Sequence, residues 1–182
     1  MLSLNNNLFI MKSISILKKL IIFYYYFAIF GILVLTIGFP IVFNLKKNKA
    51  ESLVLNFMDM NIDVVDMNLT PFIIIILIGV IIIFQLLRGI YYFKKSLNDL
   101  ANGNYFSELV VNNFKKTGKC FLIFGFGQWI YRIIIQIVVL EDLKLGINNT
   151  LFLATILGLF FLFLSDAFAK AKETKQENDL TI

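Results

Sequence analysis

Histidine is absent from the 182-residue sequence, and cysteine occurs once, as Cys120. Without histidine, the chain lacks the commonest general base and the commonest metal ligand of proteins. Zinc sites built from histidine and cysteine are therefore excluded, and a single cysteine cannot form an intramolecular disulfide. The sequence also contains no recognisable nucleophile–base pair and no phosphate-binding loop. We therefore expect no enzymatic activity, no metal and no cofactor.

Charged residues are scarce along four long apolar stretches, and the chain is 59% hydrophobic with a mean hydropathy of +0.81. The stretches cover about residues 21–43, 71–93, 120–140 and 151–165, in which only Arg88 and Arg132 carry a full charge. A helix rises ~1.5 Å per residue, so about 20 apolar residues cross the hydrocarbon of a bilayer. The fourth stretch reaches this length over residues 148–168. The sequence predicts an all-α integral membrane protein, a bundle of four transmembrane helices forming one domain over residues 1–182.

The first apolar stretch has the basic start of a secretion signal, because Lys12, Lys18 and Lys19 precede it. Its run of about 23 residues, however, exceeds the ~7–15 apolar residues of a signal peptide, and no small-residue cleavage site follows. We therefore expect a retained transmembrane helix. The sequence leaves open whether Met1 or Met11 is the start.

Basic residues predict how the spans are oriented. The side shared by the N-terminal tail, the second connection and the C-terminal tail carries Lys12, Lys18, Lys19, Arg88, Lys94, Lys95, Lys115, Lys116, Lys119, Lys170, Lys172 and Lys175. The other side carries only Lys46, Lys47, Lys49 and Lys144. Because basic residues favour the cytoplasmic side, we expect both termini in the cytoplasm. The basic residues lie at the ends of spans and form no patch interleaved with aromatic residues. This placement favours contact with the lipid bilayer over direct nucleic-acid binding.

The outer connection, residues 44–70, contains a short alternating segment. From Met58 to Val64, apolar and polar side chains alternate strictly, as in a half-buried strand. One interpretation is a small cap over the outer ends of the first two helices. The other is a strand that pairs with an external partner or ligand. We favour the cap, because a lone strand is only marginally stable.

The inner connection, residues 94–119, has a different pattern. Its apolar residues Phe106, Leu109, Val110 and Phe114 recur at helical spacing and are followed by lysines. The pattern predicts a short amphipathic linker helix at the inner headgroup surface. Beyond the fourth span, residues 169–182 form a predicted cytoplasmic tail.

Polar residues interrupt the third span at regular intervals. Gln128, Arg132 and Gln136 stand four residues apart and therefore line one face of a helix. Counted from Cys120, Arg132 lies roughly 18 Å deep, near the middle of the bilayer core. An arginine there costs ~2.5–3.5 kcal/mol, so this face is expected to point toward the bundle or water. We hypothesise that Gln85 lies opposite Gln128, with Arg132 hydrogen-bonded above them.

Two interpretations of this polar face stay open. The face either makes hydrogen bonds to neighbouring helices or forms a site for an anion or a lipid headgroup. Small residues give a second packing signal, because Ala154 and Gly158 form a pair that permits a neighbouring helix to approach closely.

The C-terminal residues Glu177-Asn178-Asp179-Leu180-Thr181-Ile182 resemble the ending of four-pass bacterial membrane proteins, the domain of unknown function 2975 family. Gly103, Phe106, Asn113 and Gly118 are similar to that family's segment before the third helix. The resemblance implies a bacterial cytoplasmic membrane location and no assigned activity. It also implies a small Cro-type helix-turn-helix transcriptional regulator as a partner.

These observations predict a non-enzymatic membrane protein that acts in sensing or regulation through protein interaction. The candidate docking residues are Glu177, Asp179, Leu180, Thr181 and Ile182, which would bind a cytosolic protein as a short strand or plug, or else form a frayed terminus. The alternative is a small transporter or an anion- or lipid-binding protein that uses Gln85, Gln128, Arg132 and Gln136. The sequence leaves open whether the chain forms a homo-oligomer.

Overall fold

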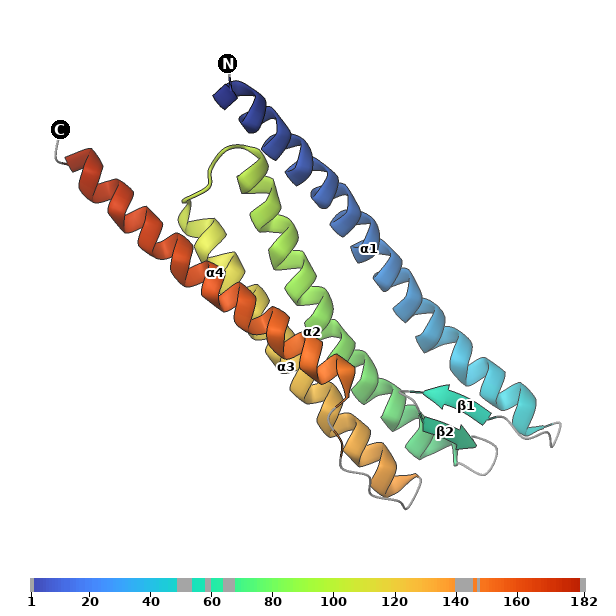
Figure 1. Cartoon of the computed structure of the whole chain (residues 1–182). Coiled ribbons are helices and arrows are strands. Elements are labelled where there is room, and N and C mark those ends of the chain that lie inside the picture. The colour runs from blue at the N-terminus through green and yellow to red at the C-terminus, as the bar shows by residue number, and fades with distance from the viewer. Residues whose placement is uncertain are drawn as a thin grey trace.

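Four long helices account for most of the chain in the computed structural model (Figure 1). The structure describes residues 2–48, 54–57, 60–63, 68–139, 146 and 148–180. The elements are α1 (Leu2–Lys47), β1 (Val54–Phe57), β2 (Met60–Asp63), α2 (Leu69–Ala101), α3 (Glu108–Val138) and α4 (Asn149–Leu180). Each helix is long and apolar enough to cross a membrane, which confirms the predicted four-pass, all-α fold.

Among the described residues, the helices pack in a row in chain order rather than around a common axis. α3 lies between α2 and α4, while α1 packs against α2 (Figure 1). Both termini and the α2–α3 turn lie at one end of the molecule, here called the termini end. The strands β1 and β2 lie at the opposite end, here called the hairpin end.

The prediction of a separate amphipathic linker helix within residues 94–119 is wrong. α2 continues through the lysines to Ala101, and α3 begins at Glu108, so the connection is a short turn. Val110 and Phe114 are 0% and 3% exposed, and they pack with Phe121 and Phe161 in a core shared by α3 and α4. Burial of these side chains within the bundle stabilises the helical turns of α3 that precede the apolar span. The segment is therefore the start of α3 and not a separate surface helix.

The cap predicted between the first two helices is a two-stranded antiparallel hairpin. Val54 pairs with Asp63 and Phe57 with Met60. The second strand falls within the alternating segment, of which Met58, Asp59 and Val64 lie outside the described residues. β1 supplies a neighbouring strand from within the chain itself, so β2 is not a lone strand.

Small residues bring α3 and α4 into close contact, as the sequence predicts. A Cβ atom on Gly125 would lie 2.8 Å from the Cβ of Ala154, and one on Gly158 would lie 2.7 Å from Cγ of Leu122. Larger residues at these positions would force the helix axes apart.

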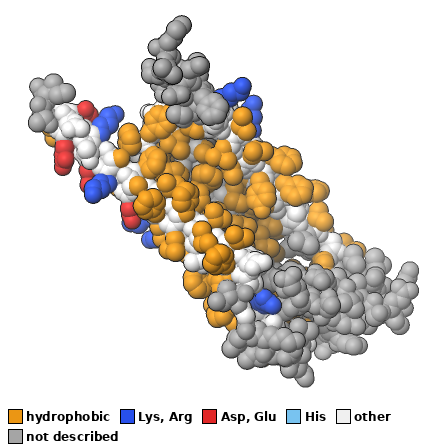
Figure 2. Space-filling model, in the orientation of Figure 1, with side chains coloured by type: hydrophobic (Ala, Val, Ile, Leu, Met, Phe, Trp, Pro, Cys, Tyr) orange, Lys and Arg blue, Asp and Glu red, His pale blue; other side chains and the backbone are white. Residues whose placement is uncertain are grey.

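Apolar side chains cover the outside of the bundle as well as its core. Figure 2 shows them across the middle of the visible face, with most of the visible charged side chains toward the termini end. Phe23 and Phe163, for example, are 71% and 66% exposed. An apolar surface of this extent is typical of helices surrounded by lipid.

Candidate functional site

The polar face predicted on α3 has two buried amides and a half-buried guanidinium. Gln128 and Gln136 are 9% and 3% exposed. Oε1 of each glutamine and Nε of Arg132 are buried without a hydrogen-bond partner in the described structure. Buried polar atoms are nearly always paired in proteins, so these three atoms mark a place where packing leaves hydrogen-bonding capacity unused.

Arg132 lies on the face of α3 that contacts α4, just beyond the point where α4 begins. Gly118, Gly125 and Arg132 are spaced a heptad apart, and both glycines contact α4. Leu151 packs against Gly125, and α4 starts at Asn149, so α3 extends roughly 16 Å past the start of α4. Arg132 is therefore roughly 9 Å from the end of α3 at Val138, closer to the hairpin end than the depth counted from Cys120 indicates.

Gln85 does not lie level with Gln128. Gly79 lies beside Tyr131 and Gly89 beside Phe121 in the antiparallel α2–α3 pair. This register places Gln85 about one helical turn, roughly 5 Å, nearer the termini end than Gln128. Oε1 of Gln85 accepts a hydrogen bond from Nη1 of Arg88 at 3.4 Å, within its own helix.

Hydroxyl groups make the hydrogen bonds between helices that the polar face was expected to make. Tyr131 Oη donates to the carbonyl of Ile75 at 2.6 Å, and Thr117 Oγ1 donates to that of Gly89 at 3.3 Å. Ser165 Oγ of α4 donates to the carbonyl of Val111 of α3 at 2.9 Å. Sequence reasoning missed these residues. Two of them, Tyr131 and Ser165, lie in predicted spans that also contain glycines. A hydroxyl residue in such a span is the signal that could have found them.

Three of the five candidate docking residues, Glu177, Asp179 and Leu180, belong to the end of α4. The helix continues to Leu180, which is 88% exposed, and Glu177 and Asp179 are exposed as well. Thr181 and Ile182 lie outside the described residues. The part of the tail that is described is therefore helical in the chain alone, and its binding to a partner as a strand or plug stays a prediction. Lys172 lies 3.9 Å from Glu108 Oε2 and links this extension of α4 to the start of α3.

Residues 20–182 match a family described as "Protein of unknown function (DUF2975)". The chain belongs to this DUF2975 family. No curated protein and no solved structure matches the chain. Family membership confirms the resemblance noted in the sequence and extends it over nearly the whole chain, although it assigns no activity.

Two of the residues that carry the DUF2975 resemblance have a structural role at the termini end. Gly103 adopts a φ of +80° in the α2–α3 turn, a backbone conformation that favours glycine. In α3, Gly118 lies directly against α4. Between them, Ser107 caps α3 by accepting a hydrogen bond from the Val110 amide at 3.1 Å and donates one to Asp99 at 2.9 Å. The segment therefore sets the geometry of the turn and of the α3–α4 contact.

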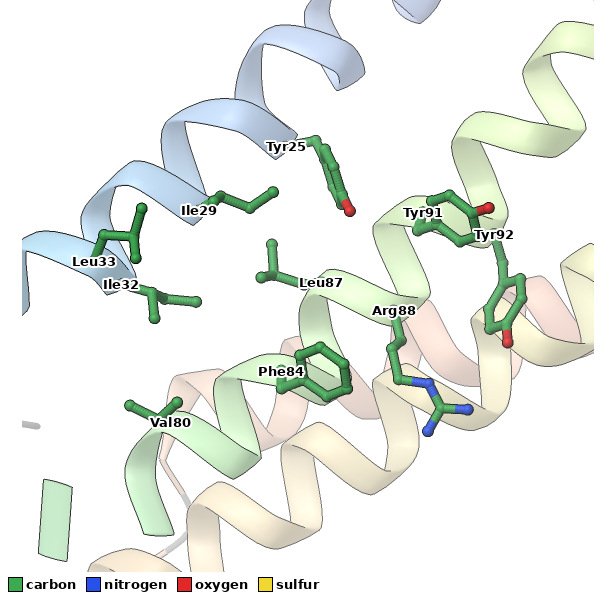
Figure 3. Close-up of a pocket in the computed structure, with 10 residues that line it drawn as sticks. All are labelled: Tyr25, Ile29, Ile32, Leu33, Val80, Phe84, Leu87, Arg88, Tyr91 and Tyr92. Atoms are coloured by element: carbon green, nitrogen blue, oxygen red, sulfur yellow. The ribbon is translucent and has the colours of Figure 1, made fainter. Parts of the chain in front are cut away.

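A cavity of about 480 Å³ lies between α1 and α2 of this DUF2975 protein. Figure 3 shows apolar side chains of both helices along it, with Tyr25, Tyr91, Tyr92 and Arg88 toward the termini end. Arg132 is not among its lining residues. Among the described residues, no group of three histidine, cysteine, aspartate or glutamate side chains could hold a metal ion.

Proposed function

We propose that this protein is a non-enzymatic, multi-pass protein of the bacterial cytoplasmic membrane that docks a cytosolic protein at its termini end. The observation that carries the proposal is the exposed helical extension of α4, residues 169–180. This extension projects roughly 18 Å beyond the predicted span. It bears charged side chains and ends in the almost fully exposed Leu180.

The extension has a face suited to a basic partner. Glu173, Glu177 and Leu180 recur at spacings of one helical turn and so lie along one side of the helix. An acidic face with an apolar end complements a positively charged protein surface. The partner class we expect is a small helix-turn-helix regulator, because DNA-binding domains of this kind are basic.

The orientation of the protein, with both termini in the cytoplasm, is part of this proposal. It is supported by the lysines of α2, α3 and α4 at the termini end, since basic residues favour the cytoplasmic side. A green fluorescent protein fused to the C-terminus should fluoresce in cells. A periplasmic reporter active at the same position would contradict this orientation.

Binding to a purified regulator tests the docking role. The full chain in lipid nanodiscs is titrated with a small Cro-type helix-turn-helix protein from the same genome. We expect binding that falls at least tenfold when the chain is truncated after Lys175 and several-fold in Leu180→Ser. The matched control is Lys115→Gln, which changes an exposed charge of α3 at the same end. Equal binding by the truncated chain would reject the tail as the docking site, and no binding by the full chain would reject this partner class.

One observation favours a second function, in which the face formed by Gln128, Arg132 and Gln136 binds an anion or a lipid headgroup, in a small transporter or a lipid-binding protein. All three residues have a buried atom without a hydrogen-bond partner in the described structure. A bound ligand would use that capacity. We rank this function second, because the α1–α2 cavity does not reach the face. Stabilisation of the full chain by added anion that is lost in Arg132→Gln would support it, and equal stabilisation of the parent and the variant would count against it.

A further inference from the structure

The cavity between α1 and α2 is an apolar groove along the outside of the bundle. Among the described residues, α2 is the helix that α1 packs against, and neither α3 nor α4 contacts α1. Ile29, Ile32 and Leu33 of α1 face Val80, Phe84 and Leu87 of α2 across it (Figure 3). Its volume of about 480 Å³ lies within the ~300–1,000 Å³ of typical small-molecule sites.

The groove is as long as one leaflet is deep. Val80 and Tyr92 mark its two ends on α2, and they are separated by roughly 18 Å of helix. The hydrocarbon core of a bilayer is ~30 Å thick, so each leaflet contributes about half of that. A transmembrane helix of a second copy would need a groove along the whole thickness. An acyl chain from a single leaflet matches the length observed.

At the termini end the lining changes from apolar to aromatic and cationic. Lys94 Nζ lies 5.0 Å from the ring centroid of Tyr25 and 5.5 Å from that of Tyr26, so it bridges α2 and α1 at the mouth of the groove. Lys95 lies 5.1 Å from the ring of Tyr91. Tyrosine rings are enriched at the depth where lipid headgroups begin.

The positive charges at this mouth are not neutralised by any carboxylate that the structure describes. Arg88, Lys94, Lys95 and Lys116 form no ion pair with any carboxylate among the described residues, whereas Lys172 does. Lys116 lies 5.3 Å from the ring of Tyr92. Cation–π contacts position an ammonium group but leave its charge in place. The mouth therefore presents several fixed cations beside an apolar groove.

We propose that the groove binds one anionic phospholipid from the leaflet at the termini end. Its acyl chain lies between α1 and α2, and its phosphate contacts Lys94, with Arg88 contributing a second charge. The charge selects anionic over zwitterionic headgroups, because each basic residue near such a surface contributes ~1 kcal/mol, or about fivefold in affinity. This site is separate from the tail and from the polar face of α3, so it stands independently of the proposed docking function.

Lipid retention by the purified full chain tests the proposal. The protein is exchanged into nanodiscs of phosphatidylcholine containing a small fraction of phosphatidylglycerol, extracted in mild detergent, and its bound lipids are counted by native mass spectrometry. We expect retention of one phosphatidylglycerol in preference to phosphatidylcholine. The preference should fall about fivefold in Lys94→Gln and further in the double variant with Arg88→Gln. The control Lys119→Gln, an exposed lysine at the same end, should retain the parent's preference.

A second variant separates the groove from the charge. Leu33→Trp fills the groove and should lower retention of both lipids while the cations stay in place. Glycerol phosphate, which has the headgroup charge without acyl chains, should not displace the bound lipid. Equal retention of the two lipids by the parent would overturn the proposal. An equal loss in Lys119→Gln would also overturn it, because the preference would then reflect the charge of the whole surface.

Discussion

Gly118 of α3 faces Gly158 of α4 so closely that a Cβ atom added to Gly118 would lie 2.6 Å from the Gly158 carbonyl oxygen. That oxygen belongs to the backbone and cannot turn away, so the two helices must separate to admit a side chain. The α3–α4 contact is thus set by the absence of side chains at two facing positions. Both glycines lie in the part of the chain that the family covers.

Gly118→Ala should therefore destabilise the bundle, although alanine favours helix formation. Overpacking of this kind costs ~1–3 kcal/mol. The measurement is thermal unfolding in detergent, followed by circular dichroism. Gly31→Ala is the matched control, because nothing lies within 4 Å of the Cβ added there, and it should leave stability unchanged or higher. An unchanged unfolding temperature in Gly118→Ala would mean that α4 packs farther from α3.

Tyr131→Phe should weaken the α2–α3 contact by a modest amount. The substitution removes the hydrogen bond from Tyr131 Oη to the Ile75 carbonyl but retains the ring. Hydrogen bonds between transmembrane helices contribute ~0.6 kcal/mol on average and at most ~1.7 kcal/mol. The free energy of unfolding in mixed detergent micelles measures the loss, with the exposed Tyr24→Phe as control. A loss no larger than in that control would show that the hydroxyl bond adds nothing to the stability of the protein in micelles.

Arg132→Gln should leave the free energy of unfolding unchanged or raise it. Nε of Arg132 has no hydrogen-bond partner among the residues that the structure describes, and an arginine within a span costs ~2.5–3.5 kcal/mol on insertion scales. Glutamine keeps a polar side chain without the charge. Unfolding of the full chain in nanodiscs, compared with Lys119→Gln, provides the measurement. A clear loss of stability would mean that the guanidinium stabilises the fold through a contact beyond the described residues.

The number and type of the main elements could be predicted from the sequence, because each transmembrane helix satisfies its own backbone hydrogen bonds. An apolar stretch of sufficient length specifies such a helix without reference to any other part of the chain. The alternation from Met58 to Val64 predicted a strand that contains β2 in the same local way. The first strand, β1, was missed, because Val54–Phe57 becomes a strand only by pairing with β2.

The residues at which neighbouring helices contact each other could not be predicted. Hydropathy marks where a span ends but carries no information on how far one helix is shifted along another. Gln85 and Gln128 were expected opposite each other, since each lies equally far from a hydropathy boundary. The register instead depends on side-chain packing between α2 and α3, as where Tyr131 lies against Gly79. α3 also extends past the start of α4, so Arg132 lies beyond the first residue of α4. This shift depends on side-chain packing in the same way.

The sequence alone determined that this is a four-pass membrane protein with its positive charge concentrated at the termini end, since transfer to lipid and charge bias are properties of single segments. Only the tertiary structure decided which polar groups are paired, how far the C-terminal helix projects, and where α1 and α2 leave a groove beside Lys94. These features arise where two helices meet, and their contact geometry is a property of neither sequence segment by itself.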